Sequence, residues 1–164
     1  MKVNSVLMLV LAGLVSFIPT RSMSQGPEAD APFGFDDLMT MLIQPRHIKL
    51  YYAGTQKNWE LAAAQSRDLR SALARIAQKV PKYMNNGVTD SINVIFVPQL
   101  NAVDAAIAAG DPKQFGTAYL ALTQACNACH VYMEHPYIVI QTPRSGDSSA
   151  YPGQDFRPIR ESPR

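Results

Sequence analysis

The sequence predicts an all-α protein in which four helices occupy residues 35–135. Apolar residues recur at spacings of three, four and seven along this region, which places them on one face of a helix. Glycine, proline and short polar side chains separate the periodic segments, where helices end and begin. At 164 residues the chain has the length of a single domain.

The first helix is predicted over residues 35–53, ending at Gly54 with Thr55 placed to cap the next helix. Pro45 lies inside it and is expected to kink or divide it, because proline has no amide hydrogen for the helix interior. The second helix is predicted over residues 56–80. Its apolar positions are Ala62, Leu69, Leu73, Ile76 and Val80.

The third helix competes with a strand, because residues 92–97 are rich in β-branched side chains. We favour a helix that continues to Gly110, since a lone strand would leave its backbone groups unpaired. The helical stripe continues through Leu100, Val103 and Ile107. Asp111 and Pro112 then supply an N-cap and a first helical residue for the fourth helix.

The fourth helix has the clearest period of the chain. Its apolar face is formed by Phe115, Tyr119, Leu122, Cys126 and Cys129, at spacings of four, three, four and three. Both cysteines therefore extend this face. Residues 136–164 follow as an extended tail, rich in Pro, Gly and Ser, which is expected to pack partly through Tyr137, Ile138 and Ile140.

Residues 126–130 read Cys-Asn-Ala-Cys-His, and C-x-x-C-H is the attachment signature of a c-type haem. Each thiol can add to one vinyl group of the haem, and the histidine can bind the iron. The chain has two cysteines, and both lie in the motif. We therefore predict one covalent haem c, held by Cys126 and Cys129, with His130 as the proximal ligand.

Two other roles for the cysteines have less support from the sequence. A disulfide or a thioredoxin-like redox pair would lie at the start of a helix after a strand, whereas the residues before Cys126 have a helical pattern. A zinc ion would need a fourth ligand, and His47, His135 and the carboxylates lie at irregular separations from the motif.

The N-terminus predicts export. Lys2, the apolar stretch 6–18 and the small residues ending at Ser24 are typical of a secretory signal peptide over residues 1–24. An uncleaved anchor is the alternative, but the stretch is shorter than the roughly 20 residues of a membrane span, and no later stretch comes close. We therefore expect a periplasmic protein without a membrane span after cleavage.

The charge of the mature chain excludes an electrostatic argument for nucleic-acid binding. The chain has 15 Lys and Arg against 13 Asp and Glu; residues 1–24 contain two of the basic residues and no acid, which leaves 13 against 13. The sequence pI of 8.6 is therefore not the footprint of a nucleic-acid or membrane partner.

The motif near the end of the fourth helix, the four-helix order and the segment Leu38-Met39 ahead of Gly54 resemble the class II c-type cytochromes, the cytochrome c-prime family. The resemblance covers residues 35–135 and implies an antiparallel four-helix bundle whose first helix approaches the other haem face. It also implies a possible homodimer through the first two helices. We expect a single-electron carrier with a periplasmic redox partner, and not an enzyme, because the sequence has no nucleophile-base constellation, phosphate loop or paired carboxylates in helical register. Pro45, the β-branched third segment and the long tail depart from the family pattern.

The family divides on the sixth iron ligand. A methionine there implies an electron carrier, whereas an apolar residue implies a five-coordinate protein that binds nitric oxide or carbon monoxide. In an up-down-up-down bundle the end of the fourth helix lies beside the start of the first. His130 lies roughly 27 Å along its helix, and a similar distance back from Gly54 reaches residues 38–39. Our order is Met39, then Met41, then no ligand, with His47 last.

Overall fold

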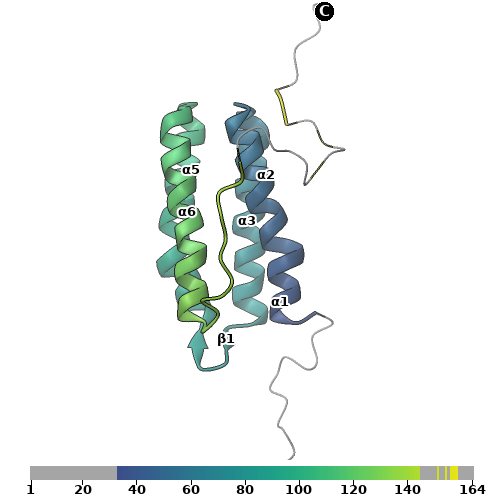
Figure 1. Ribbon diagram of the computed structural model, residues 1–164, viewed down its shortest axis with the longest axis vertical. Coiled ribbons are helices and arrows are strands. Elements are labelled where there is room, and N and C mark those ends of the chain that lie inside the picture. The colour runs from purple at the N-terminus through teal and green to yellow at the C-terminus, as the bar shows by residue number, and fades with distance from the viewer. Residues whose placement is uncertain (1–32, 145–150, 152–153, 155, 159–164) are drawn as a thin grey trace, which may run out of the picture.

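The computed structural model describes residues 33–144, 151, 154 and 156–158. The all-α prediction is confirmed for this part of the chain: long helical segments lie side by side, and β1 (Lys82–Tyr83) and β2 (Asn86–Gly87) are its only strands (Figure 1). The predicted signal peptide over residues 1–24 lies outside the described residues.

The first helical segment runs without a break through α1 (Phe35–Leu38), η2 (Met39–Ile43) and α2 (Gln44–Thr55). Pro45 lies in the first turn of α2, directly after the π-helical turn η2. The wider turn accommodates a residue that cannot donate a helical hydrogen bond. Arg46 Nη1 donates to the Leu42 carbonyl at 2.7 Å. A kink or a break was predicted at Pro45, and the structure has instead a continuous helix that changes from π-helical to α-helical just before this residue.

The second helix, α3 (Trp59–Lys79), begins later than predicted. Its N-cap is Asn58, whose side-chain oxygen accepts from the Leu61 amide at 3.1 Å, so the prediction of Thr55 as the cap was wrong. Thr55 instead belongs to α2, where its hydroxyl donates to the Tyr52 carbonyl. The inner face of α3 consists of Ala62, Ser66, Leu69, Ala72, Leu73 and Ile76. Val80, predicted on this face, is the half-buried C-cap.

The third segment is helical, so the strand alternative for residues 92–97 is excluded. It consists of α4 (Val88–Ser91), η3 (Ile92–Phe96) and α5 (Val97–Ala109), and it starts after the β1–β2 hairpin. Pro98 follows a π-helical turn in the same way as Pro45. This helical segment therefore begins at Val88, before the β-branched residues 92–97.

Residues Val88–Ala109 have the length and composition of a membrane-spanning helix, with a mean hydropathy of 1.5 over the best window, and no other helix in the described part of the chain does. The expectation that no later stretch comes close to a span was therefore wrong. One face of this segment is buried in the core, at Val88, Ile92, Phe96, Leu100, Val103, Ala106 and Ile107. A mostly buried core helix passes the same test of length and composition, whereas 33% of this window is buried.

The fourth helix, α6 (Pro112–Tyr132), begins as predicted. The Asp111 carboxylate accepts from the amides of Lys113 and Gln114 at 2.8 and 3.1 Å, and Gly110 precedes it with a φ of 63°. The buried face follows the predicted spacing through Phe115, Tyr119, Leu122 and Cys126.

After α6 the chain reverses and runs back along the helices in an extended form (Figure 1). Ile140 is half-buried and packs against the core, as predicted for the tail. Ile138 is 39% exposed, although it lines the cavity described below. Tyr137 is 74% exposed, so its predicted packing was wrong. The tail is held instead through hydrogen bonds of the backbone, which are described below.

Candidate functional site

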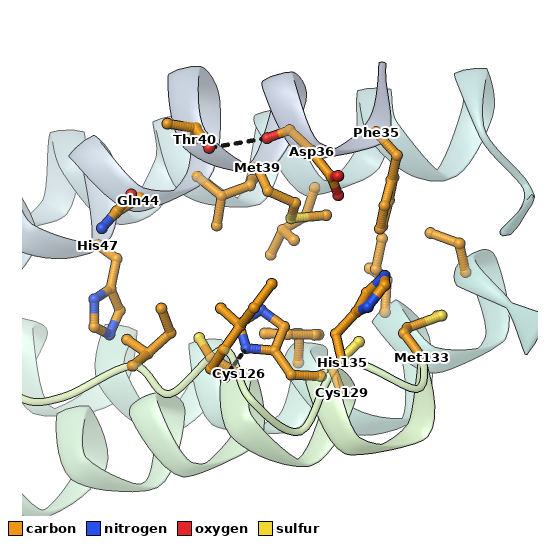
Figure 2. Close-up of a pocket in the computed structure, with 18 residues that line it drawn as sticks. Phe35, Asp36, Met39, Thr40, Gln44, His47, Cys126, Cys129, Met133 and His135 are labelled. Atoms are coloured by element: carbon orange, nitrogen blue, oxygen red, sulfur yellow. Dashed lines mark hydrogen bonds between the residues drawn. The ribbon is translucent and has the colours of Figure 1, made fainter. Parts of the chain in front are cut away.

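A cavity of about 300 Å³ lies where the start of the first helical segment meets the end of α6. Its walls are mostly apolar. The lining includes Phe35, Met39 and Ile43 from α1 and η2, Ile92 and Phe96 from η3, and Cys126, Cys129 and His130 from α6. Asp36, Thr40 and Gln44 add polar groups along one side (Figure 2). An apolar cavity with a few polar groups is typical of a cofactor site.

The two cysteines lie on the wall formed by α6 (Figure 2). Both are free thiols; Cys126 is buried and Cys129 is half-buried. Burial raises the pKa of Cys126 to about 12 and that of Cys129 to about 11. A thioredoxin-like pair has a lowered pKa and lies at a helix N-terminus, whereas these thiols lie near the C-terminal end of α6. Neither the disulfide nor the redox-pair alternative gains support from this geometry.

His130 has one ring nitrogen fixed by the backbone. Its Nδ1 lies 2.8 Å from the Ile138 carbonyl oxygen, which can only accept, so Nδ1 carries the hydrogen. Nε2 has no hydrogen-bond partner among the described residues. A metal-binding histidine commonly donates its second ring nitrogen to a carbonyl in this way, which leaves the first nitrogen free to bind the metal.

The other two histidines have both ring nitrogens engaged. His47 is 2% exposed, with Nε2 3.0 Å from the Thr123 hydroxyl and Nδ1 3.0 Å from the Tyr119 hydroxyl. Burial lowers the pKa of His47 to about 4, so the ring is neutral at pH 7. Although His47 lines the cavity, its nitrogens are committed to α6, which argues against the last of the predicted sixth ligands.

His135 also lines the cavity, and its nitrogens are engaged by two tyrosines. Nε2 lies 3.1 Å from the Tyr83 hydroxyl, and Nδ1 lies 2.8 Å from the Tyr137 hydroxyl. All three histidines of the chain are described by the structure, and only His130 retains a ring nitrogen without a hydrogen bond.

The structure separates the two candidate methionines. Met39 is half-buried in η2 and lines the cavity on the wall opposite Cys126 (Figure 2). Met41 is 54% exposed and does not line the cavity. The predicted site residues Cys126, Cys129, His130 and Met39 are therefore brought together at one cavity.

Several lining residues were not identified from the sequence. Phe35 shares a helical face with Met39 at a spacing of four residues, and this period could have revealed it. Ile138 and Ile140 were expected to pack as part of the tail, but the tail has no helical period that could have placed them at this cavity.

The residues present fit a haem better than a free metal ion. Within the described residues, no group of three or more His, Cys, Asp or Glu side chains could hold a metal ion, whereas zinc takes four ligands. A haem brings its own equatorial ligands, so its iron needs only one or two axial groups from the chain. One free imidazole nitrogen, two thiols and apolar walls meet that need.

Comparisons of the chain with protein-family models, with curated proteins and with solved structures found no match. The interpretation of the site therefore depends on its own residues. The resemblance to the class II c-type cytochromes stays a prediction.

Proposed function

We propose that this protein is a periplasmic c-type cytochrome, an antiparallel four-helix haem bundle of the class II type that transfers single electrons. One haem c is bonded to the sulfurs of Cys126 and Cys129, and His130 Nε2 is the proximal ligand. The observation that carries the proposal is the available nitrogen of His130, which lies at an apolar cavity shared with two free thiols.

The haem supplies an iron that exchanges one electron, and the chain sets the conditions for that exchange. The thiols fix the position of the group on α6. Phe35, Ile92 and Phe96 line the cavity with apolar side chains, and such surroundings would disfavour the more highly charged ferric state. No residue in this site forms a nucleophile and base pair, so we propose an electron carrier and not an enzyme.

We propose Met39 as the sixth ligand, because its thioether faces the cavity from the wall opposite α6. A methionine ligand raises the potential of the iron and keeps both axial positions filled. The second candidate function is a five-coordinate protein that binds nitric oxide or carbon monoxide. It is favoured by Phe35 and Ile43, which line the same wall and cannot bind iron.

The remaining parts of the proposal concern the setting of the protein. Residues 1–24 direct export, and the mature chain meets a redox partner protein in the periplasm, as a monomer or as a homodimer. The balanced charge of residues 25–164 supports a protein partner over nucleic acid. We propose that the apolar segment Val88–Ala109 stays in the bundle, so that the mature chain has no membrane span.

The optical spectrum of the periplasmically expressed holoprotein tests this function, recorded in both redox states before and after carbon monoxide. A low-spin spectrum with a thioether-to-iron band and no response to the gas is expected. A high-spin spectrum that shifts with the gas would favour the second candidate. Absence of covalent haem in maturation-competent cells, with a Cys126→Ser/Cys129→Ser variant giving the same result as the wild type, would overturn both.

A further inference from the structure

The tail beyond α6 forms part of the wall behind His130. Ile138 supplies the carbonyl that accepts from His130 Nδ1 at 2.8 Å, and it also lines the cavity together with Ile140. At Ile138 this segment has no regular secondary structure of its own. The Ile138 amide donates to the His135 carbonyl at 3.0 Å, which holds this residue from the side of α6. A second contact holds the tail beyond Ile138.

That contact is made by Asn127, the first residue between the two cysteines of the motif. Its amide group pairs with the backbone of Ile140 on both sides. The Ile140 amide donates to Asn127 Oδ1 at 2.7 Å, and Asn127 Nδ2 donates to the Ile140 carbonyl at 2.9 Å. Two hydrogen bonds from one side chain fix both the position and the direction of the tail two residues beyond Ile138.

We propose that Asn127 is a positioning residue for the proximal histidine: it clamps the tail at Ile140 and thereby presents the Ile138 carbonyl to His130 Nδ1. This inference rests on the proposed function, because it concerns the histidine that would bind the haem. The residue types support it, since Asn carries both the donor and the acceptor that an extended backbone needs.

The clamp has a consequence for the redox potential. A histidine that donates from Nδ1 to an acceptor is a more basic ligand, and groups beyond the ligand commonly change metal affinity or activity tenfold or more. A more basic imidazole favours the ferric state. Loss of the clamp is therefore expected to move the midpoint potential to a more positive value. A tenfold change in the ferric-to-ferrous ratio corresponds to a shift of about 59 mV for one electron.

The test compares three variants of the holoprotein. Asn127→Leu removes both hydrogen bonds of the clamp. Ile140→Pro removes the amide hydrogen from the tail side and leaves the haem attachment motif intact, so it remains informative if Asn127→Leu disturbs haem attachment. Ala128→Leu is the matched control, because Ala128 lies in the same motif and is exposed.

Two measurements are made on each variant: amide hydrogen exchange over residues 137–142, and the midpoint potential by spectroelectrochemistry. We expect faster exchange and a more positive potential in Asn127→Leu and Ile140→Pro, with neither change in Ala128→Leu. Faster exchange at an unchanged potential would overturn the positioning role, and unchanged exchange in both would overturn the clamp itself.

The exchange measurement separates this inference from the proposed function, because it does not require haem. If the wild-type chain carries no haem, the proposed function fails and the role toward the haem fails with it. Exchange in the same variants then still decides whether Asn127 holds the tail.

Discussion

At the scale of single residues, His47 is a buried base held between two hydroxyl groups of α6. The Tyr119 hydroxyl also lies within donating distance of the His47 carbonyl, at 2.9 Å, and the Thr123 hydroxyl of the Tyr119 carbonyl, at 3.0 Å. A neutral ring donates from one nitrogen only, so one of the two hydroxyls donates to the ring instead of to its carbonyl. These contacts join α2 to α6 across the interior. Because the ring is neutral in the folded protein, the network makes stability depend on pH.

We expect stability to fall as the pH is lowered from about 6.5 to 4, the window between the ordinary pKa of histidine and the folded pKa of His47. In this window the unfolded chain binds a proton at His47 that the folded chain does not, so acid favours unfolding. The upper limit of the loss is about 3 kcal/mol. Urea unfolding at pH 7 and pH 4.5 measures it.

His47→Gln is the control for this prediction, since carboxylates also titrate at low pH. The variant is expected to be less stable at pH 7 and to lose less stability between the two pH values. An equal pH dependence in both proteins would show that His47 does not titrate in this window.

Met39 and Met41 provide a second test at the residue scale, because they lie two positions apart and only Met39 lines the cavity. Met39→Ala is expected to convert a six-coordinate low-spin spectrum to a high-spin spectrum that responds to carbon monoxide. Met41→Ala is expected to leave the spectrum unchanged. A six-coordinate spectrum in Met39→Ala would remove Met39 from consideration as the ligand.

At the scale of elements, the helices that the sequence predicted best are those with the most regular apolar period. The buried faces of α3 and α6 follow from spacings of three and four residues, which burial against neighbouring helices requires. The cap of α3 was harder to predict, because Thr55 and Asn58 are both favourable N-cap residues and the side chains alone do not distinguish them.

The two π-helical turns could not be predicted from local propensity. Pro45 and Pro98 each indicated an interruption, but proline is compatible with a kink, a break or a π-helical turn. Packing of the flanking residues into one core selects the continuous helix: Phe35 and Leu50 on either side of η2 are both buried.

The contact between α2 and α6 depends on a glycine. Gly54 lies against the Phe115 ring, and a Cβ at this position would overlap that ring. We expect Gly54→Ala to destabilise the protein by about 1–3 kcal/mol, because the ring must move within a packed core. Chemical denaturation of the holoprotein measures the change.

Gly116→Ala is the matched control, since Gly116 is a helical, exposed glycine and a Cβ there would meet nothing within 4 Å. It is expected to stabilise the protein by about 0.5–1 kcal/mol through helix propensity. A stabilising effect of Gly54→Ala as well would mean that the Phe115 ring is free to move away.

At the scale of the whole molecule, the candidate site joins two ends of the described chain. The sequence predicted that Met39 and His130 lie close together, because the start of the first helix lies beside the end of the last in an up-down-up-down bundle. Both residues line the cavity. It could not place Ile138 at the same site, because the path of the tail depends on the Asn127 side chain and not on a repeating pattern. The motif therefore predicts His130 as a ligand, and the tertiary structure adds the contacts of Ile138 and Asn127 that we propose hold it in place.

The same arrangement makes the fold dependent on what fills the cavity. The cavity of about 300 Å³ has mostly apolar walls and is partly open, so without a cofactor this apolar surface faces water. We therefore expect the chain without haem to unfold at a lower temperature, because haem would bind the folded state alone and cover these walls. Circular dichroism monitors thermal unfolding of the holoprotein and of the same chain from cells that lack haem attachment. The Cys126→Ala/Cys129→Ala variant, expressed in maturation-competent cells, repeats the comparison. Equal melting temperatures would contradict the prediction, because they would mean that the apolar walls close on one another without a cofactor between them.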